Sequence, residues 1–207
     1  MESGKLGNPI IVEVVGLPGS GKSFFASQFA KTFHAAVVSI DKIRWTLFAH
    51  HTYSDNENVM VQQVADLIIT ELLKTGRTFV LDGGYNTKDA REEIQKRAEK
   101  VGFQILTVVV QVDELTAKRR ATKRSAKNPG DRHKQSLSAD AFTMHSQEYE
   151  VPPVNKNTVV ISGKHTYSAQ ARTVLKKILE NKDGSISTKT MSRPTPILRG
   201  RGGPFVQ

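Results

Sequence analysis

Short apolar runs alternate with longer amphipathic stretches along most of this chain. Five runs rich in β-branched residues predict strands buried in a sheet: 10–15, 35–40, 78–81, 104–112 and 158–161. Apolar residues at helical spacing and capping residues predict helices over 23–33, 59–73, 88–100, 114–124, 139–150 and 168–181. A further helix is predicted to follow Asp41 and to run through Arg44 to Ala49. Repeated strand–helix units favour an α/β fold with a parallel sheet, helices on both faces, and ligands bound beyond the carboxyl ends of the strands.

The alternating pattern stops after residue 182. Residues 183–207 are rich in Gly, Ser, Thr and Pro and contain the short Arg-Gly segment 199–203. We expect residues 1–182 to form one domain around a single core, and residues 183–207 to form a disordered basic tail. The Arg-Gly segment is a weak signal for nucleic-acid contact, and a tail without its own function is the favoured interpretation.

The composition excludes several classes of protein. The 207 residues contain no cysteine, which excludes disulfides and thiolate metal sites. No apolar run approaches the roughly 18 residues that cross a bilayer, and the first residues lack the pattern of a secretory signal. These features predict a cytoplasmic protein that does not bind membranes.

One eight-residue segment follows the first predicted strand and opens the first predicted helix. It fits the phosphate-binding pattern G-x-x-x-x-G-K-[ST] with Gly16, Leu17, Pro18, Gly19, Ser20, Gly21, Lys22 and Ser23. Glycines let successive backbone amides point at one phosphate, and the following helix adds free amides and a positive dipole end. Lys22 would reach the β- and γ-phosphates, Ser23 would bind Mg²⁺, and we include Phe24 in the nucleotide site. The segment predicts binding of a nucleoside triphosphate and Mg²⁺.

Two carboxylates at the ends of predicted strands are candidates for the reacting centre. Asp41 and Arg44 are three residues apart at a helix start, which puts both side chains on one face toward the cleft. Asp41 would accept the proton of an attacking hydroxyl, with capping of its helix as the alternative. Arg44 would hold an anionic group of the acceptor and orient Asp41 through a bidentate contact. Asp82 has three open roles: a Mg²⁺ ligand through water, a hydrogen bond to the acceptor, or a cap on the turn before Gly83.

A strongly basic segment follows the fourth predicted strand. The chain has a formal net charge of +10, and eight Lys and Arg residues lie between positions 118 and 134 against the single acid Asp131. We expect residues 118–136 to form a lid over the nucleotide. In this lid Arg120 and Arg124 share a helix face, and Arg124 neutralises charge on the transferred phosphoryl group. A solvated helix face and a nucleic-acid footprint are the alternatives.

Together these motifs resemble the kinase domain of polynucleotide kinases and the wider group of small P-loop kinases that includes the zeta toxins. The resemblance covers roughly residues 8–181. It rests on segments 16–23, 39–44 and 80–86 with Arg91, on the lid arginines, and on segment 142–152. It implies a P-loop NTPase fold, a three-layer sandwich whose five-stranded parallel sheet has the order 2-3-1-4-5.

The resemblance also implies a reaction, the transfer of the γ-phosphoryl group of ATP, with Mg²⁺, to a hydroxyl. The catalytic residues would then be Lys22, Asp41, Arg44 and Arg124. Ser23 and Asp82 would hold the metal ion, Arg120 and Arg124 would contact the nucleotide, and Asp41, Arg44 and Asp82 would contact the acceptor. The choice of ATP over GTP rests on the resemblance alone.

The acceptor is the open point. We predict a polynucleotide 5′-hydroxyl, because it fits the basic surface and Arg44. A small-metabolite or toxin-type kinase of the same fold is the first alternative. An ATP-binding switch that transfers no phosphoryl group to a hydroxyl is the second, and a nucleic-acid-binding protein that uses the tail and the basic segment is the third.

Overall fold

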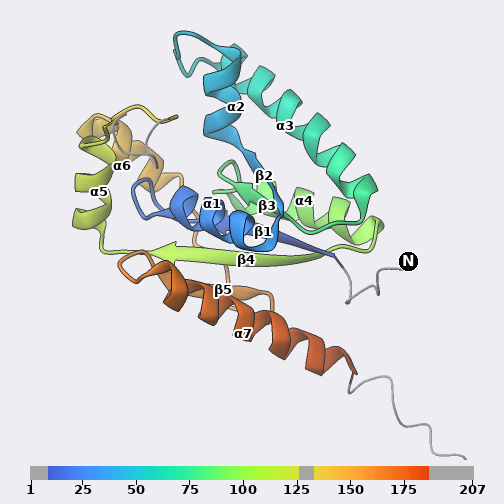
Figure 1. Cartoon of the computed structure of the whole chain (residues 1–207). Helices are drawn as coiled ribbons and strands as arrows, with labels where there is room; N and C mark the ends of the chain where they lie inside the picture. The colour runs from blue at the N-terminus through green and yellow to red at the C-terminus, as the bar shows by residue number, and fades with distance from the viewer. Residues whose placement is uncertain (1–8, 126–132, 187–207) are drawn as a thin grey trace, which may run out of the picture.

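Strands and helices alternate along the chain as the hydrophobic pattern predicts (Figure 1). The computed structural model describes residues 9–125 and 133–186. The strands are β1 (Ile10–Val15), β2 (Ala36–Ser39), β3 (Phe79–Asp82), β4 (Gln104–Gln111) and β5 (Thr158–Ser162). The helices are α1 (Lys22–Phe33), α2 (Ile40–Leu47), α3 (Asp55–Thr75), α4 (Lys88–Lys100), α5 (Glu114–Thr122), α6 (Ala139–Gln147) and α7 (Tyr167–Ile186).

The five strands form one parallel sheet in the order β2-β3-β1-β4-β5. This confirms the predicted α/β fold class and strand order. Because the strands are parallel, their carboxyl ends lie along one edge, where Asp82 is in register with Val14 of β1 and with Ser39 of β2. The end of β3 therefore lies between the segments that lead into α1 and α2.

Helices bury both faces of the sheet, because side chains of a strand point alternately to opposite sides. Val12 and Val14 of β1 belong to a core that contains Phe25 and Phe29 of α1 and Val174 of α7. Residues of β1 that point the other way join a core with α3 and α4. In Figure 1, α7 lies below the sheet and α3 above it. The sheet is thus the middle of three layers, and its carboxyl edge is free to carry a site.

Several element boundaries differ from the predicted ones. Helix α2 begins at Ile40, which was predicted to belong to the preceding strand, so Asp41 lies in its first turn as expected and Ser39 holds the capping position. Helix α3 begins at Asp55, with the Ser54 side chain as its cap. The start of α3 precedes the apolar positions from which this helix was predicted, because capping and acidic residues begin a helix without contributing to its apolar face.

The carboxyl-terminal part also differs in detail. Helix α7 continues to Ile186, past the predicted domain end at 182. Residues 187–207 of the predicted tail and residues 126–132 of the predicted lid lie outside the described part of the chain. Within residues 9–125 and 133–186, no helix has the length and apolar character needed to span a membrane.

A glutamate lies inside the sheet core. Glu13 of β1 is 1% exposed, and its Oε2 accepts a hydrogen bond of 2.9 Å from Thr107 Oγ1 on the neighbouring strand β4. Its other carboxyl oxygen, Oε1, has no partner among the described residues. Burial raises the pKa of Glu13 to about 7, although the Thr107 hydrogen bond and the charge of Arg91 act in the opposite direction.

The buried carboxyl should make stability depend on pH. The unfolded chain releases the Glu13 proton near pH 4.5 and the folded chain near pH 7, so stability should fall as the pH rises between these values. The loss is at most about 3 kcal/mol, from 1.36 kcal/mol per unit of pKa shift. We expect Glu13→Gln to lack this fall when urea unfolding is measured from pH 4.5 to 8. The exposed-site variant Glu71→Gln should keep it, and equal pH profiles for wild type and Glu13→Gln would contradict the assignment.

Candidate functional site

The predicted phosphate-binding segment forms the turn between β1 and α1. At two positions of this turn only glycine fits, because the φ angle is positive and a neighbouring backbone atom lies where a Cβ would be. A Cβ at Gly16 (φ +143°) would lie 2.4 Å from the Val110 carbonyl oxygen, and one at Gly19 (φ +80°) would lie 2.2 Å from the Ala117 carbonyl oxygen. The turn therefore packs directly on β4 and α5, which places the start of α1 at the carboxyl edge of the sheet.

Lys22 lies inside this turn. Its Nζ donates hydrogen bonds to the carbonyl oxygens of Gly16 (2.7 Å) and Leu17 (3.0 Å). Burial lowers the pKa of Lys22 to about 8, repulsion from Lys134 lowers it further, and attraction to Asp82 acts in the opposite direction. A cation on a phosphate-binding turn is suited to polyphosphate, since the ligand charge would restore the ordinary pKa of the ammonium group.

Asp82, at the end of β3, accepts two hydrogen bonds. Ser23 Oγ donates to its Oδ1 at 2.8 Å, and Ser39 Oγ donates to its Oδ2 at 3.0 Å. Asp82 is 6% exposed. Hydroxyl and carboxylate oxygens are the ligands that Mg²⁺ prefers, and Mg²⁺ usually takes only one or two of them from a protein beside substrate phosphates and water. Ser23 and Asp82 therefore fit the predicted metal site.

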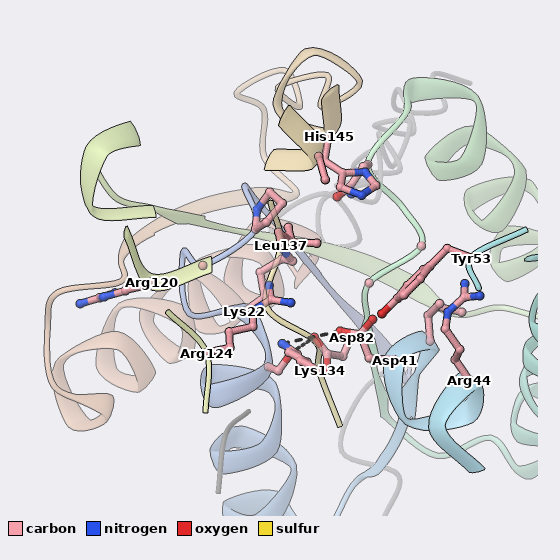
Figure 2. Close-up of a pocket in the computed structure, with 18 of the residues that line it drawn as sticks. Lys22, Asp41, Arg44, Tyr53, Asp82, Arg120, Arg124, Lys134, Leu137 and His145 are labelled. Carbon is pink, nitrogen blue, oxygen red and sulfur yellow. Dashed lines mark hydrogen bonds and ion pairs between the residues drawn. The ribbon is translucent and has the colours of Figure 1, made fainter. Parts of the chain in front are cut away.

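Lys134 reaches the same place from the lid segment. Its Nζ donates a hydrogen bond to Ser23 Oγ and lies 3.7 Å from Asp41 Oδ2. Figure 2 shows Lys22, Asp41, Asp82 and Lys134 converging in this part of the cavity. The sequence analysis included Lys134 only as one of the basic lid residues. Nothing local could have singled it out, because this contact joins positions 111 residues apart.

Arg44 does not form the predicted bidentate contact with Asp41. It is 7% exposed, its Nη1 lies 2.7 Å from Glu57 Oε1, and its Nη2 donates to Asn58 Oδ1 at 2.8 Å. The guanidinium carbon also lies 4.6 Å from the centre of the Tyr53 ring. Arg44 therefore joins α2 to α3. The sequence analysis did not identify its partners, because the start of α3 was predicted after them.

The carboxylate of Glu57 is held in its charged form. Glu57 is 4% exposed, and its second oxygen accepts hydrogen bonds from the Thr52 and Tyr53 amides. Burial raises the pKa of Glu57, but the bonds from Arg44, Thr52 and Tyr53 outweigh burial and lower the pKa to about 2. The ion pair with Arg44 is consequently complete at every pH at which the protein would work.

The predicted arginines have different surroundings. Arg124 Nη1 donates to the Gln135 carbonyl at 2.9 Å, and the charge of Arg124 contributes to the lowered pKa of Lys22. Arg120 Nη1 donates to the Gly163 carbonyl at 3.1 Å, and its side chain points away from Lys22 (Figure 2). Arg91 donates to the carbonyls of Tyr85 and Asn86 and so supports the loop after β3.

A cavity of about 1010 Å³ unites these side chains. The predicted site residues that line it are Pro18, Gly19, Gly21, Lys22, Ser23, Phe24, Asp41, Arg44, Asp82, Arg120 and Arg124. Gly16, Leu17, Ser20 and Arg91 do not line it; Ser20 is buried, and Leu17 packs against a small core formed by α5 and α6. The structure thus gathers the predicted phosphate, metal and base residues in one space.

The sequence matches the AAA domain family over residues 11–152. No curated protein sequence matches the chain at a significant level. Among solved structures, a gluconokinase from Sinorhizobium meliloti 1021 is similar, at 14% identity and a TM-score of 0.64, over 89% of this chain and 99% of that one. The APS kinase CysC of Mycobacterium tuberculosis, solved with AMPPNP and APS, is similar at 19% identity and a TM-score of 0.60. This match covers 84% of this chain and 99% of the APS kinase chain.

A structure of the Pnkp1/Rnl/Hen1 RNA repair complex is also similar, at 20% identity and a TM-score of 0.57. The matched region covers 72% of this chain but only 46% of the chain in the repair complex, so the likeness to a polynucleotide kinase is partial. At such identities the likeness is one of fold. The phosphate-binding turn, the 2-3-1-4-5 sheet and the family match over residues 11–152 together establish that the chain belongs to the AAA domain family and has the fold of the P-loop kinases.

Proposed function

We propose that this protein is a kinase that transfers the γ-phosphoryl group of ATP, with Mg²⁺, to a hydroxyl of a small molecule. The observation that carries the proposal is the position of Asp41. Its carboxylate lines the same cavity as Lys22 and Ser23, and it is the carboxylate to which the lid cation Lys134 is paired. A group that accepts a proton beside a phosphate-binding turn is what transfer to a hydroxyl requires.

The described residues divide the work of the reaction. Amides of the turn and Lys22 bind the β- and γ-phosphates, and Arg124 neutralises charge on the transferred group from the lid. Ser23 and Asp82 would hold Mg²⁺, which supplies charge neutralisation at the phosphates. Asp41, whose side chain is 43% exposed, accepts the proton of the acceptor hydroxyl as that oxygen attacks the phosphorus.

A small acceptor has more support than the polynucleotide predicted from the sequence. The match with this protein extends along 99% of the gluconokinase chain and 99% of the APS kinase chain, but along only 46% of the chain in the Pnkp1 complex. Arg44, the residue expected to hold an anionic acceptor, has both terminal nitrogens bonded to α3. A polynucleotide with a 5′-hydroxyl is therefore kept as one member of the assay panel rather than as the proposal.

Replacement of Asp41 tests the kinase assignment. Asp41→Asn cannot accept the proton, so transfer of labelled γ-phosphate should fall about 10²- to 10⁴-fold while the Kd for ATP changes little. The acceptor panel would contain sugars, amino sugars, sugar acids, nucleosides and 5′-hydroxyl oligonucleotides. The control Asp89→Asn alters an exposed residue of α4 outside the cavity and should transfer normally. Equal transfer rates in wild type and Asp41→Asn would contradict the role of Asp41 as the base, whereas ATP binding without transfer to any acceptor would favour a nucleotide-dependent switch.

Replacement of Lys134 tests its electrostatic contact with the phosphate site. Repulsion from Lys134 helps to lower the pKa of Lys22 to about 8, so ATP binding should weaken above about pH 8 as Lys22 loses its proton. In Lys134→Met this weakening should move to higher pH, by up to about one unit.

The single tryptophan offers the signal for this titration. The ring centre of Trp45 lies 6.0 Å from that of His133, the residue that precedes Lys134 in the sequence. ATP would be titrated by Trp45 fluorescence from pH 6.5 to 9.5, with calorimetry as a second measurement of the Kd. The control Lys118→Met removes a lid cation outside the cavity and should leave the profile unchanged. An unshifted profile in Lys134→Met would show that the two ammonium groups do not interact.

A further inference from the structure

The cavity has two chemically different halves. The half around the phosphate-binding turn is lined by cations: Lys22, Arg119, Arg120, Lys123, Arg124 and Lys134. The opposite half is formed by α2, the start of α3, the loop after β3 and the end of α6. Its polar lining consists chiefly of Asp41, Tyr53, Asp55, Asn58, Asn86 and Glu148. We call this second part the acceptor half, since Asp41 belongs to it.

The segment at the end of α6 lies beside the loop that follows β3. The amide of Glu150 donates a hydrogen bond of 3.0 Å to the Asn86 carbonyl, and the Glu150 carboxylate accepts one from the Lys88 amide. These bonds place Glu148 on the same side of the cavity as Asn86. Three acidic residues, Asp41, Asp55 and Glu148, therefore line this part of the cavity, and Asp41 is the one of them that is paired with Lys134.

The cations of the acceptor half are neutralised by protein groups. Arg44 is paired with Glu57 at 2.7 Å, and its second terminal nitrogen donates to Asn58. His145 Nδ1 lies 3.2 Å from Glu148, so even a protonated ring would be balanced by that carboxylate. Within the described residues Asp55 has no ion-pair partner. The acceptor half is therefore negative overall, in contrast to the nucleotide half.

One uncharged oxygen of the acceptor half is also able to accept a hydrogen bond from a ligand. Asn86 Oδ1 is buried and has no partner among the described residues, although Asn86 lines the cavity. The Asn58 oxygen is already used, because it accepts from Arg44 Nη2, and Asn58 Nδ2 donates to the Tyr53 carbonyl. Hydroxyl and ammonium groups can donate to such oxygens, whereas a carboxylate or a phosphate can only accept.

We propose that the acceptor is a small polyhydroxylated molecule without an anionic group, and that a protonated amine on it strengthens binding. This rests on the proposed kinase function and names its substrate class. An anionic group in the acceptor half would face the carboxylates of Asp55 and Glu148, neither of which is paired with a Lys or Arg among the described residues, and repulsion is strong where water is partly excluded. An ammonium group would be attracted to the same carboxylates, and neutral hydroxyls would bind with the donors they carry.

The test compares acceptors of matched shape and different charge. The probes are glucose, glucosamine and glucuronate, and galactose, galactosamine and galacturonate. Calorimetry would measure their binding to the protein saturated with Mg²⁺ and the non-transferable nucleotide AMPPNP, and a separate assay would measure transfer from ATP. In at least one series, the amino sugar should bind about 10-fold or more tightly than the acid, with the neutral sugar between them.

A variant then assigns the preference to this part of the cavity. The double variant Asp55→Asn, Glu148→Gln should reduce the preference for the amino sugar over the acid at least 5-fold through KM, and should leave kcat within about 2-fold. The control Glu71→Gln removes an exposed carboxylate of α3 that does not line the cavity, and should keep the wild-type preference. An unchanged preference in the double variant would overturn the assignment to these carboxylates.

The outcomes separate this inference from the proposed function. Binding with the expected preference but without transfer would support the inference and overturn the kinase assignment. Transfer with acids bound as tightly as amino sugars, or more tightly, would overturn the inference and support the kinase assignment. Binding of none of the six sugars would overturn the inference, and the kinase assignment would then depend on the wider acceptor panel.

Discussion

The two hydrogen bonds accepted by Asp82 hold the site together, because they join three elements that meet only in the folded chain. Ser23 belongs to α1, Ser39 ends β2, and Asp82 ends β3, the strand between β2 and β1. A buried carboxylate is costly unless its oxygens are bonded, so the two hydroxyls make this arrangement of β2, β3 and α1 favourable. The phosphate-binding turn directly precedes α1 in the chain, and helix α2, which carries Asp41, directly follows β2. Their relative position is therefore determined by the parallel register of the sheet.

Charge is distributed so that each half of the cavity has one sign. The cations of the turn and the lid surround the place where polyphosphate would bind, and their mutual repulsion contributes to the lowered pKa of Lys22. On the other side, the guanidinium of Arg44, the one that is buried within residues 9–125 and 133–181, joins α2 to α3. A buried charge left without its partner strongly destabilises a protein, so Glu57 is as much a part of this packing as Arg44. The groups that line the acceptor half then include the carboxylates of Asp55 and Glu148 and the amide oxygen of Asn86.

The lid is attached to the acceptor side as well as to the nucleotide side. Lys134 contacts Ser23 and Asp41, and the neighbouring His133 lies against Trp45 of α2. Lys134 Nζ donates a hydrogen bond to the Ser23 hydroxyl, which would also bind Mg²⁺. Two cations repel each other too strongly to share one hydroxyl oxygen at close range. Under the proposed function, a metal ion and this ammonium group would therefore compete for the Ser23 oxygen.

The sequence by itself determined the features that depend on neighbouring residues. Hydrophobic period predicted the strands, the resemblance supplied their order, and the spacing of Gly16 to Ser23 predicted the phosphate-binding turn, since each depends on residues close in the chain. The tertiary structure alone decided the partners of charged groups. The pairing of Arg44 with Glu57 required the true start of α3, and the contact of Lys134 with Ser23 required the lid to fold back across 111 residues. Coulomb attraction acts between any opposite charges that come close, so composition reveals which charges a chain carries, but only the fold decides which of them remain available to a ligand.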